Sequence, residues 1–315
     1  MAVLVACDLG KAYLKAMIIK PNGSVCRESF KSKVLKLNEL EDYPVQGNSY
    51  KIEYQGETYL IGDQGVEASY ELEKSTINHK LSLFTALSSL VNSGETINLV
   101  IGCPASIYKN KESRKNYVAY LTDNKQIKFK VAGDEYFYTV DKVLVLPEGS
   151  GAPYVYPSKF QGKRVLIVDF GGLNMQISIA DDCTLELDTL STFNHGYYKL
   201  IDMVKDRFSS EYSMPIDDKE ADNILCNFGM KIKGKVDEKS VSLLNELCDT
   251  YLDKASSLIR SKNFNTDTLE VVFIGGTSEF LGSKLSRVAP HGFVCKDSRW
   301  ANVEGFYKVA QLRGL

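Results

Sequence analysis

One strand-and-turn pattern occurs twice in this chain, about half of its length apart. The first copy is Val3–Gly10 (VLVACDLG) and the second is Val165–Gly172 (VLIVDFGG). Each copy is a short apolar run, as expected of a buried strand, that ends in an aspartate and a glycine turn. An apolar strand resumes after both turns. The repeat predicts a duplicated fold whose two halves begin in the same way.

Composition leaves room for two such halves and excludes several classes of protein. The 315 residues are 44% hydrophobic and 25% charged, as in an ordinary globular protein. The net charge of −2 disfavours a protein whose whole surface binds nucleic acid. We find no apolar run of the ~20 residues that a membrane helix needs and no signal-peptide pattern. Seven scattered cysteines and three dispersed histidines predict neither a disulfide framework nor a zinc site. We therefore expect a soluble, cytoplasmic, mixed α/β protein.

Strands and helices alternate along the chain. We expect one helix from a cap at Ser75 to Leu90 and another over Asp237–Ile259, where apolar residues recur at helical spacing. A basic cluster lies on a further expected helix, and we interpret it as a solvent-exposed face (Lys109, Lys111, Arg114 and Lys115). The expected strands are, in chain order, Ala2–Cys7, Tyr13–Ile19, Lys51–Tyr54, Thr58–Ile61, Ile97–Ile101, Ile127–Val131, Tyr136–Tyr138, Lys142–Leu146, Lys163–Val168 and Glu270–Ile274.

The chemistry of the two repeated turns favours a phosphate ligand. Glycine permits positive φ and lets main-chain N–H groups approach phosphate oxygens without a Cβ in the way. Asp8 and Asp169 would repel phosphate directly, so they fit the site only if a hydrated Mg²⁺ lies between. Lys15, on the strand that follows the first turn, would place a positive charge beside the phosphates. A single turn of this kind is more often an ordinary hairpin, but two copies favour a ligand site.

A third glycine turn ends a later buried strand. Phe273–Ser278 (FIGGTS) leads toward an expected helix that Thr277 or Ser278 would cap. Such a turn lets a flat ring or a sugar approach the backbone, and a helix N-terminus attracts anions. The chain has neither the Gly-x-Gly-x-x-Gly fingerprint nor a Walker Gly-Lys-Ser/Thr motif. The NAD-binding and P-loop interpretations therefore lose their main support.

Glycine turns at three strand ends resemble the nucleotide site of the superfamily of actin, sugar kinases and heat-shock chaperone ATPases. Asp8–Lys15 is similar to its first phosphate motif, Asp169–Asn174 to its second and Ile274–Thr277 to its adenosine motif. Leu146–Ala152 is similar to the segment that connects the halves. These motifs occur in the family's order and cover the length of the chain. Within the superfamily the chain most resembles bacterial plasmid-segregation actins of the ParM type, through Tyr59–Gly65, Val100–Pro104 and Ala301–Gly305.

The resemblance implies an ATPase with defined site residues. It assigns Glu148 to the attacking water, with Asp169 as a second catalytic residue, and Asp8 and Asp169 to Mg²⁺ through water. A different interpretation of Glu148 is a helix N-terminal residue favoured by the helix dipole. ATP is the nucleotide that the family favours, and GTP is plausible. The implied nucleotide-binding residues are Asp8, Gly10, Lys11, Ala12, Lys15, Gly171, Gly172, Asn174, Gly275, Gly276 and Thr277.

Two positions depart from the family's pattern. Asn174 stands where a hydroxyl residue is usual, and its amide can still donate a hydrogen bond with a different reach. Lys11 stands where small or hydroxyl residues are common, so it either strengthens phosphate binding or points to solvent. Neither change removes an acidic group or a required glycine.

The expected architecture is an actin-like duplicated α/β fold with a nucleotide cleft between two domains. The first domain should cover 1–156 together with a C-terminal helix in 300–315, and should carry a small inserted subdomain at about 35–70. The second should cover 157–299, with an inserted subdomain at about 195–265. Each domain should be a mixed sheet flanked by helices.

Three function classes compete for this fold. A nucleotide-driven filament needs only other copies of the chain, and head-to-tail contacts generate open filaments. As a plasmid-segregation actin it would act through a DNA-bound adaptor protein, without direct sequence-specific nucleic-acid binding and without a membrane. A small-molecule kinase, of a sugar or an acid, is the alternative, although we find no motif for a substrate base. A chaperone-type ATPase would need a substrate-binding domain beyond Leu315.

Overall fold

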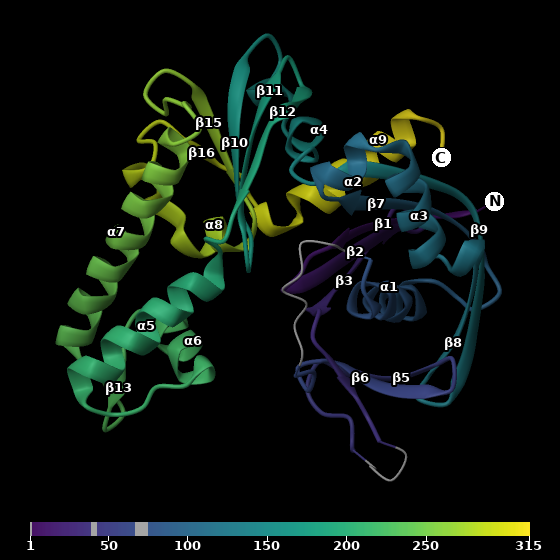
Figure 1. Cartoon of the computed structure of the whole chain (residues 1–315), viewed down its shortest axis with the longest axis horizontal. Helices are drawn as coiled ribbons and strands as arrows, with labels where there is room; N and C mark the ends of the chain where they lie inside the picture. Colours follow the sequence, from purple (N-terminus) through teal and green to yellow (C-terminus); the bar gives the residue numbers. More distant parts are fainter. Residues whose placement is uncertain (1, 39–42, 67–74) are drawn as a thin grey trace. The chain divides into compact units, whose positions relative to one another are not determined.

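A computed structural model of the chain describes residues 2–38, 43–66 and 75–315. The chain divides into two compact units (Figure 1). Unit 1 comprises Met1–Lys159 and Trp300–Leu315, and unit 2 comprises Phe160–Arg299. The expected inserted subdomain at 35–70 falls partly on residues 39–42 and 67–70, which lie outside the described residues.

Unit 2 is built on a sheet of five strands in the order β12-β11-β10-β15-β16. The central strand β10 pairs antiparallel with β11 and parallel with β15, and its apolar residues from Val165 to Val168 are fully buried. Near-continuous apolar runs are typical of strands covered on both faces. The strands are β10 (Arg164–Phe170), β11 (Met175–Asp181), β12 (Thr184–Phe193), β15 (Glu270–Ile274) and β16 (Phe293–Val294).

Unit 1 contains five strands in a matching order, β3-β2-β1-β7-β9. Its central strand β1 pairs antiparallel with β2 and parallel with β7, as β10 pairs with β11 and β15. The outer pairings match too, because β2–β3 and β11–β12 are antiparallel while β7–β9 and β15–β16 are parallel. The strands are β1 (Val3–Leu9), β2 (Tyr13–Ile19), β3 (Val25–Lys31), β7 (Thr96–Cys103) and β9 (Asp134–Pro147).

The shared strand order confirms the expected duplicated α/β fold with two mixed sheets. It also aligns the two repeated turns residue by residue. Asp8 lies opposite Lys15 in the β1–β2 register, and Asp169 lies opposite Gln176 in the β10–β11 register. Each aspartate therefore occupies the same place in its sheet, near the carboxyl end of the central strand.

Four further strands extend the sheet of unit 1 beyond β9, in the order β8-β5-β6-β4. This extension faces the first strands across α1, which the sheet surrounds (Figure 1). Every residue from Asn78 to Leu87 of α1 is therefore buried, as expected for a helix packed on all sides. The elements are β4 (Val34–Lys36), β5 (Ser49–Tyr54), β6 (Glu57–Gly62), α1 (Ile77–Leu90) and β8 (Gln126–Val131).

The start of α1 differs from the sequence prediction by one residue. The N-cap is Thr76, with extended backbone angles, and its hydroxyl is bonded to His79 Nδ1 at 2.7 Å instead of capping a backbone N–H. The predicted cap at Ser75 is therefore wrong. The Thr76–His79 contact is a side-chain interaction that residue spacing does not reveal.

Helices cover both faces of the first five strands of unit 1. Alternate residues of β1 divide between two cores, since Val5 and Cys7 pack with α1 whereas Ala6 packs with Val303 and Phe306 of α9. Because successive strand residues point to opposite faces, α1 and α9 lie on opposite sides of the sheet. The elements are α2 (Ala105–Lys109), α3 (Lys111–Leu121), η1 (Asp123–Lys125), α4 (Ala152–Val155), η2 (Pro157–Lys159) and α9 (Ala301–Leu312).

Two further differences from the sequence prediction lie in unit 1. The strands expected at Tyr136–Tyr138 and Lys142–Leu146 form one continuous strand, β9, which pairs first with β8 and then only with β7. The basic cluster is divided between α2 and α3, because Asn110 separates them and accepts the Ser113 N–H as the N-cap of α3.

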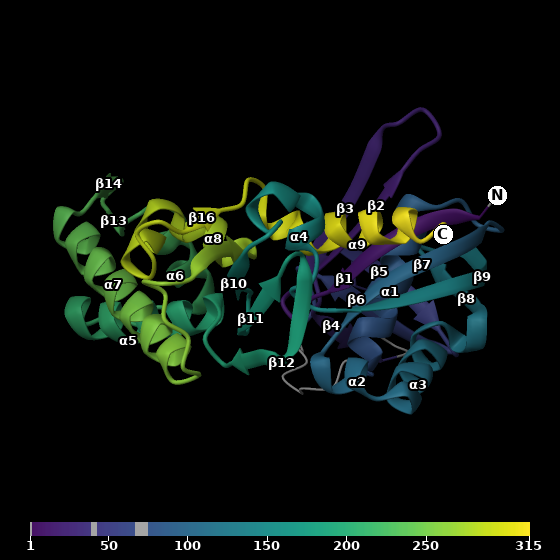
Figure 2. The ribbon, with the colours of Figure 1, turned by 90° about the horizontal axis from the view of Figure 1, so that it is seen from above.

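Unit 2 carries its longest helices beside its sheet (Figure 2). Its longest helix, α7, begins after Asp237, whose carboxylate accepts the Ser240 N–H, so the predicted helix at Asp237–Ile259 is confirmed. The buried face of α7 packs with α5 and the sheet. The elements are α5 (Tyr197–Tyr212), α6 (Asp218–Cys226), β13 (Lys231–Ile232), β14 (Lys235–Val236), α7 (Glu238–Arg260), α8 (Gly276–Leu281) and η3 (Gly282–Arg287), followed by η4 (Ser298–Trp300).

Candidate nucleotide-binding site

The first glycine turn lies in unit 1, between β1 and β2. Gly10 donates its N–H to the Asp8 carbonyl at 2.9 Å, and a Cβ on Gly10 would lie under 3.0 Å from the Tyr13 carbonyl oxygen. Glycine is therefore required by this close approach. The Ser32 hydroxyl donates to the Gly10 carbonyl at 2.6 Å. Sequence reasoning missed Ser32, because this contact depends on how β3 returns beside β2.

Asp8 and Lys15 face each other across this hairpin. Lys15 Nζ lies 3.6 Å from Asp8 Oδ2, and Asp8 has only 7% of its surface exposed. A carboxylate this buried needs a compensating charge, which Lys15 provides. A hydrated cation bound at Asp8 would compete with Lys15 for the same oxygen, leaving the ammonium group to interact with phosphate.

Glu148 follows directly on the end of β9, in the same unit as Asp8. Its N–H donates to the Cys103 carbonyl at 3.0 Å, and its side chain is nearly buried. The hydroxyl of Tyr117 donates to the Gly102 carbonyl at 2.9 Å. Burial raises the pKa of Tyr117, and the negative charges of Glu148 and Asp8 raise it further. Both carboxylates therefore lie near one buried hydroxyl, which sequence reasoning missed.

The backbone around Glu148 excludes the helix-dipole interpretation of this residue. The following helix, α4, begins only at Ala152, with Gly151 as its N-cap, and has four residues. Glu148 is thus a strand-end residue and not the first residue of a helix. A carboxylate at the end of a paired strand has a fixed position, which orienting a water molecule requires.

The second glycine turn connects β10 to β11 in unit 2. Gly171 donates its N–H to the Asn174 carbonyl at 2.9 Å. The N–H groups of Tyr197 and Tyr198 donate to the carbonyls of Gly171 and Gly172, at 3.1 and 2.9 Å. The first N–H groups of a helix have no partner within it, so the turn satisfies two of them at the start of α5.

The third glycine turn contacts the second. Gly275 has φ +92° and ψ 158°, and a Cβ there would lie under 3.0 Å from Asp169 Oδ1 and from the Phe170 carbonyl oxygen. The Thr277 hydroxyl donates to the Gly171 carbonyl at 2.8 Å. Unit 2 therefore brings Asp169, Gly171, Gly275 and Thr277 together, because β10 and β15 are parallel neighbours that end side by side.

The expected capping role of Thr277 or Ser278 is wrong. The N-cap of α8 is Gly275, without a side-chain cap. Thr277 bonds across to the second turn, and the Ser278 hydroxyl donates back to the Ile274 carbonyl at 2.6 Å. Neither hydroxyl caps α8, and each donates instead to a carbonyl at the end of β10 or β15.

The remaining predicted residues lie within these turns. Lys11 is half-buried and Ala12 is buried in the first turn, Asn174 is half-buried in the second, and Gly276 is exposed in the third. Sequence reasoning missed Arg299, whose Cβ lies 3.7 Å from the position of a Cβ on Gly276 and whose Nε lies 3.9 Å from Glu279 Oε2.

The side chains present suit a hydrated magnesium ion better than a directly coordinated metal. Within the described ranges, no group of three or more His, Cys, Asp and Glu side chains could hold a metal ion. The first turn supplies one carboxylate, Asp8, and the second turn supplies one, Asp169. Mg²⁺ usually keeps several waters and binds one or two carboxylates plus phosphate oxygens, so these aspartates fit it.

Comparison with known proteins decides the family. A family model described as the N-terminal domain of actin-like proteins matches residues 6–151. A solved structure described as the Alp12 filament is 30% identical, over 100% of this chain and 99% of that chain, with a TM-score of 0.72. The chain belongs to the actin-like proteins. No curated protein matches it.

More distant actin-like proteins share the fold. An archaeal actin homologue, Ta0583, solved in complex with ADP, is 16% identical over 98% of this chain and 99% of that chain, with a TM-score of 0.75. A 15-stranded ParM filament from Clostridium botulinum is 15% identical over 99% of both chains, with a TM-score of 0.74. The actin-like superfamily predicted from the glycine turns is confirmed by the match to the Alp12 filament and by the family model, and these two structures share its fold.

In this actin-like chain, no helix within the described residues is both long enough and apolar enough to cross a membrane.

Proposed function

We propose that this actin-like protein binds ATP with Mg²⁺, hydrolyses it, and assembles head to tail into filaments. The observation that carries the proposal is the match between the two units. Each has an aspartate and a glycine turn at the end of the same central strand, in sheets of the same order. The full-length similarity to the Alp12 filament supports assembly.

We assign nucleotide binding to the glycine turn of unit 1 and to the two glycine turns of unit 2. The turns at Gly10 and at Gly171 and Gly172 let the main chain approach the phosphates closely, with Lys15 as a counter-charge. Asp8 and Asp169 hold Mg²⁺ through water. Gly275, Gly276 and Thr277 take the adenosine, and the complex of ADP with Ta0583 supports a nucleotide of this kind. The domain boundaries proposed for this function are 1–156 with 300–315, and 157–299.

Hydrolysis is assigned to Glu148. Phosphoryl transfer to water demands positioning and a charge field more than covalent chemistry. Glu148, nearly buried at the end of β9, has a fixed carboxylate that can orient the attacking water or accept its proton. Asp169 would act with it by holding a hydrated Mg²⁺, which would offset negative charge on the phosphates.

The cellular role that we propose is plasmid segregation in the cytoplasm, through a DNA-bound adaptor protein. An open filament follows when one surface of a copy contacts a different surface of the next. The ParM-type similarity of the sequence motifs supports this role. Direct sequence-specific binding of DNA is not part of the proposal.

The test follows assembly and phosphate release together. Light scattering and electron microscopy of the purified protein should show filaments with ATP and Mg²⁺, and none with EDTA. GTP in place of ATP measures the base preference. Asp169→Ala should lose Mg²⁺-dependent binding of a labelled nucleotide. Monomers at high concentration with ATP and Mg²⁺ would contradict the filament proposal and favour a kinase.

A further inference from the structure

The strand β9 has an open edge along its second half. Its pairing with β8 ends at Thr139, whereas its pairing with β7 continues to Pro147. Within the part of the chain that the structure describes, no strand pairs with the other edge of residues 140–147. An unpaired strand edge presents main-chain N–H and C=O groups that can pair with another chain.

The direction of these main-chain groups follows from two hydrogen bonds. The N–H of Lys142 donates to Asn98 Oδ1 at 3.1 Å, and the N–H of Glu148 donates to the Cys103 carbonyl, both toward β7. Main-chain groups of successive strand residues alternate between the two edges. The N–H and C=O of Val143 and Val145 therefore face the open edge.

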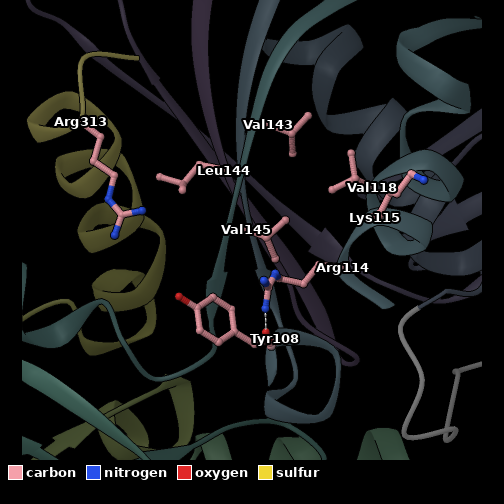
Figure 3. A pocket seen from close by; sticks show the side chains of 8 residues that line it. All are labelled: Tyr108, Arg114, Lys115, Val118, Val143, Leu144, Val145 and Arg313. Carbon is pink, nitrogen blue, oxygen red and sulfur yellow. Dashed lines mark hydrogen bonds between the residues drawn. The ribbon is translucent and has the colours of Figure 1, made fainter. Parts of the chain in front are cut away.

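A hollow of about 640 Å³ lies along this edge (Figure 3). Three consecutive strand residues line it, Val143, Leu144 and Val145, with Val118 of α3. Successive side chains of a strand point to opposite faces, so three in a row can line one hollow only if it follows the edge. All three are half-buried, and they offer apolar contacts on both faces of an added strand.

The rim of the hollow is positively charged. Its charged lining residues are Arg114, Lys115 and Arg313, and none of the lining residues is acidic. Figure 3 shows Arg313 on one side of β9, with Arg114 and Lys115 on the other. The Arg114 guanidinium donates to the Tyr108 carbonyl, and its Cζ lies 5.3 Å from the centroid of the Tyr108 ring, so the group is held in place. A guanidinium has five N–H donors, which leaves donors for a ligand.

We propose that this edge is a docking site for an extended acidic segment of a partner protein, which pairs with β9 as an added strand. Strand addition supplies main-chain hydrogen bonds for affinity and side-chain contacts for specificity. Carboxylates on the segment would pair with Arg114, Lys115 and Arg313, and its apolar residues would pack on Val143, Leu144 and Val145. A nucleic acid would use the charges but not the strand edge or the apolar lining.

The interpretation of the basic cluster therefore changes in part. Lys109 and Lys111 are exposed, as expected of a solvent-facing surface, whereas Arg114 packs on Tyr108 and lines the hollow with Lys115. The two groups differ in position, because Lys109 ends α2 and Lys111 begins α3, whereas Arg114 and Lys115 lie about one turn further along α3. Sequence spacing alone placed all four on one face.

The binding experiment uses three fluorescent peptides and fluorescence anisotropy. The first alternates valine with glutamate, the second replaces each glutamate by lysine, and the third is the acidic peptide with alternate main-chain nitrogens methylated. The acidic peptide should bind, and the other two should bind at least about tenfold more weakly, because each lacks either the charges or the strand hydrogen bonds. Equal binding of the methylated peptide would overturn strand addition.

The matched variants reverse two charges each. Lys115→Glu with Arg313→Glu should weaken binding of the acidic peptide by about tenfold or more, since two charge-assisted contacts become repulsive. Lys219→Glu with Lys254→Glu makes the same change in net charge at exposed positions of unit 2, and should leave binding within about threefold. Circular dichroism of both variants checks that they fold.

Hydrogen exchange locates the bound peptide. The acidic peptide should slow exchange of the Val143 and Val145 amides in the full chain, because those N–H groups would then be hydrogen-bonded. Exchange that is unchanged there, or no binding of any peptide, would overturn the proposal. Stronger binding of a double-stranded DNA oligonucleotide than of the acidic peptide would assign the surface to nucleic acid. Loss of self-assembly only in Lys115→Glu with Arg313→Glu would assign it to a second copy.

Discussion

Gly275 couples two turns of unit 2 through its backbone conformation. Its φ of +92° and ψ of 158° lie in a region that is essentially restricted to glycine. The space beside it is also closed, because Asp169 and the Phe170 carbonyl lie where a Cβ would be. The position of the Asp169 carboxylate therefore depends on the absence of a side chain at residue 275.

Replacement of Gly275 by alanine should lower both stability and nucleotide binding. The strained backbone and the steric overlap together should cost about 2–5 kcal/mol of unfolding free energy. The displaced Asp169 should also weaken Mg²⁺-dependent nucleotide affinity. Gly234→Ala is the control, since Gly234 has φ +80° but nothing within 4 Å, and it should cost about 1–2 kcal/mol without affecting binding. Urea unfolding and nucleotide titration measure the two effects, and equal costs for both variants would contradict the steric argument.

His195 is a buried titratable residue in unit 2. Its Nε2–H donates to the Tyr251 carbonyl at 2.9 Å, and its ring stacks on the Tyr251 ring at 4.1 Å. Burial lowers the pKa of His195, and the positive charges of Lys254 and Lys199 lower it further, against the one hydrogen bond that raises it. The imidazole is therefore neutral in the folded protein at neutral pH.

Stability should fall in acid because of His195. The unfolded histidine, with a pKa of about 6.5, binds a proton that the folded one resists, so the stabilising contribution is present above about pH 6.5 and is lost as the pH falls below it. Between pH 7.5 and pH 5.5, the unfolding free energy of His195→Gln should fall by about 1 kcal/mol less than that of the wild type. His291→Gln, at an exposed histidine, is the control. If the unfolding free energies of the wild type and of His195→Gln had the same pH dependence, His195 would not contribute to the loss of stability in acid.

The packing of α9 on α4 depends on two glycines at the crossing. A Cβ on Gly305 would lie under 3.0 Å from the main chain of Gly151, and a Cβ on Gly151 would lie under 3.0 Å from Ala301 and Asn302. This close approach holds the C-terminal helix beside the segment that follows Glu148. The same helix buries Val303 and Phe306 against the sheet of unit 1.

Gly305→Ala should therefore destabilise unit 1, although alanine favours helices. The higher helix propensity of alanine would add about 1 kcal/mol to the unfolding free energy, whereas overpacking at this closed site would remove about 1–3 kcal/mol. We therefore expect a net loss of stability. Lys308→Ala, at an exposed position of α9, is the control, because it introduces alanine into the same helix without overlap and should leave the unfolding free energy within about 0.5 kcal/mol. Thermal unfolding measures the stability of the two variants. A Gly305→Ala protein that is more stable than the wild type would contradict the steric argument, because α9 would then have moved away from α4 without a loss of stability.

The two units differ chemically although their strand orders agree. Lys15 lies opposite Asp8 in unit 1, and Gln176 takes the equivalent place opposite Asp169 in unit 2. In the first turn a cation, Lys15, therefore pairs with the aspartate from the opposite strand, whereas a neutral amide takes that register position in the second turn. The carboxylate that we propose for hydrolysis, Glu148, also belongs to unit 1. The duplication thus provides two frameworks, and the side chains give them different roles.

Glu148→Gln should separate nucleotide binding from hydrolysis in the whole molecule. Glutamine keeps the volume of this nearly buried residue but cannot accept a proton, so hydrolysis should slow by about 10²–10⁴-fold while nucleotide still binds. Filaments should then assemble and persist, because the contacts that ATP stabilises remain until the γ-phosphate is lost.

Phosphate release and light scattering in one sample test this coupling. Glu246→Gln, at an exposed position of α7, should behave as the wild type in both measurements. Normal hydrolysis in Glu148→Gln would remove this residue from the catalytic role. Assembly lost together with hydrolysis would instead make Glu148 a structural residue.

The sequence by itself determined the duplicated fold and the location of its turns. The apolar runs at β1, β10 and β15 are buried strands because few other structures bury four or five consecutive apolar residues between turns. Glycine identified the turns, since the required backbone conformation and close approach belong to the residue itself. Asp8, Asp169 and Gly275 were therefore accessible from local sequence alone.

Tertiary structure decided the contacts between segments that are distant in the sequence. Three hydrogen bonds depend on strand order and register, which residue spacing does not specify. They join the Ser32 hydroxyl to Gly10, the Tyr117 hydroxyl to Gly102 and the Thr277 hydroxyl to Gly171. The burial of α1 on every side and the open edge of β9 have the same origin. Pairing in a sheet joins residues that are far apart along the chain, so its side-chain partners become definite only when the strands are in place.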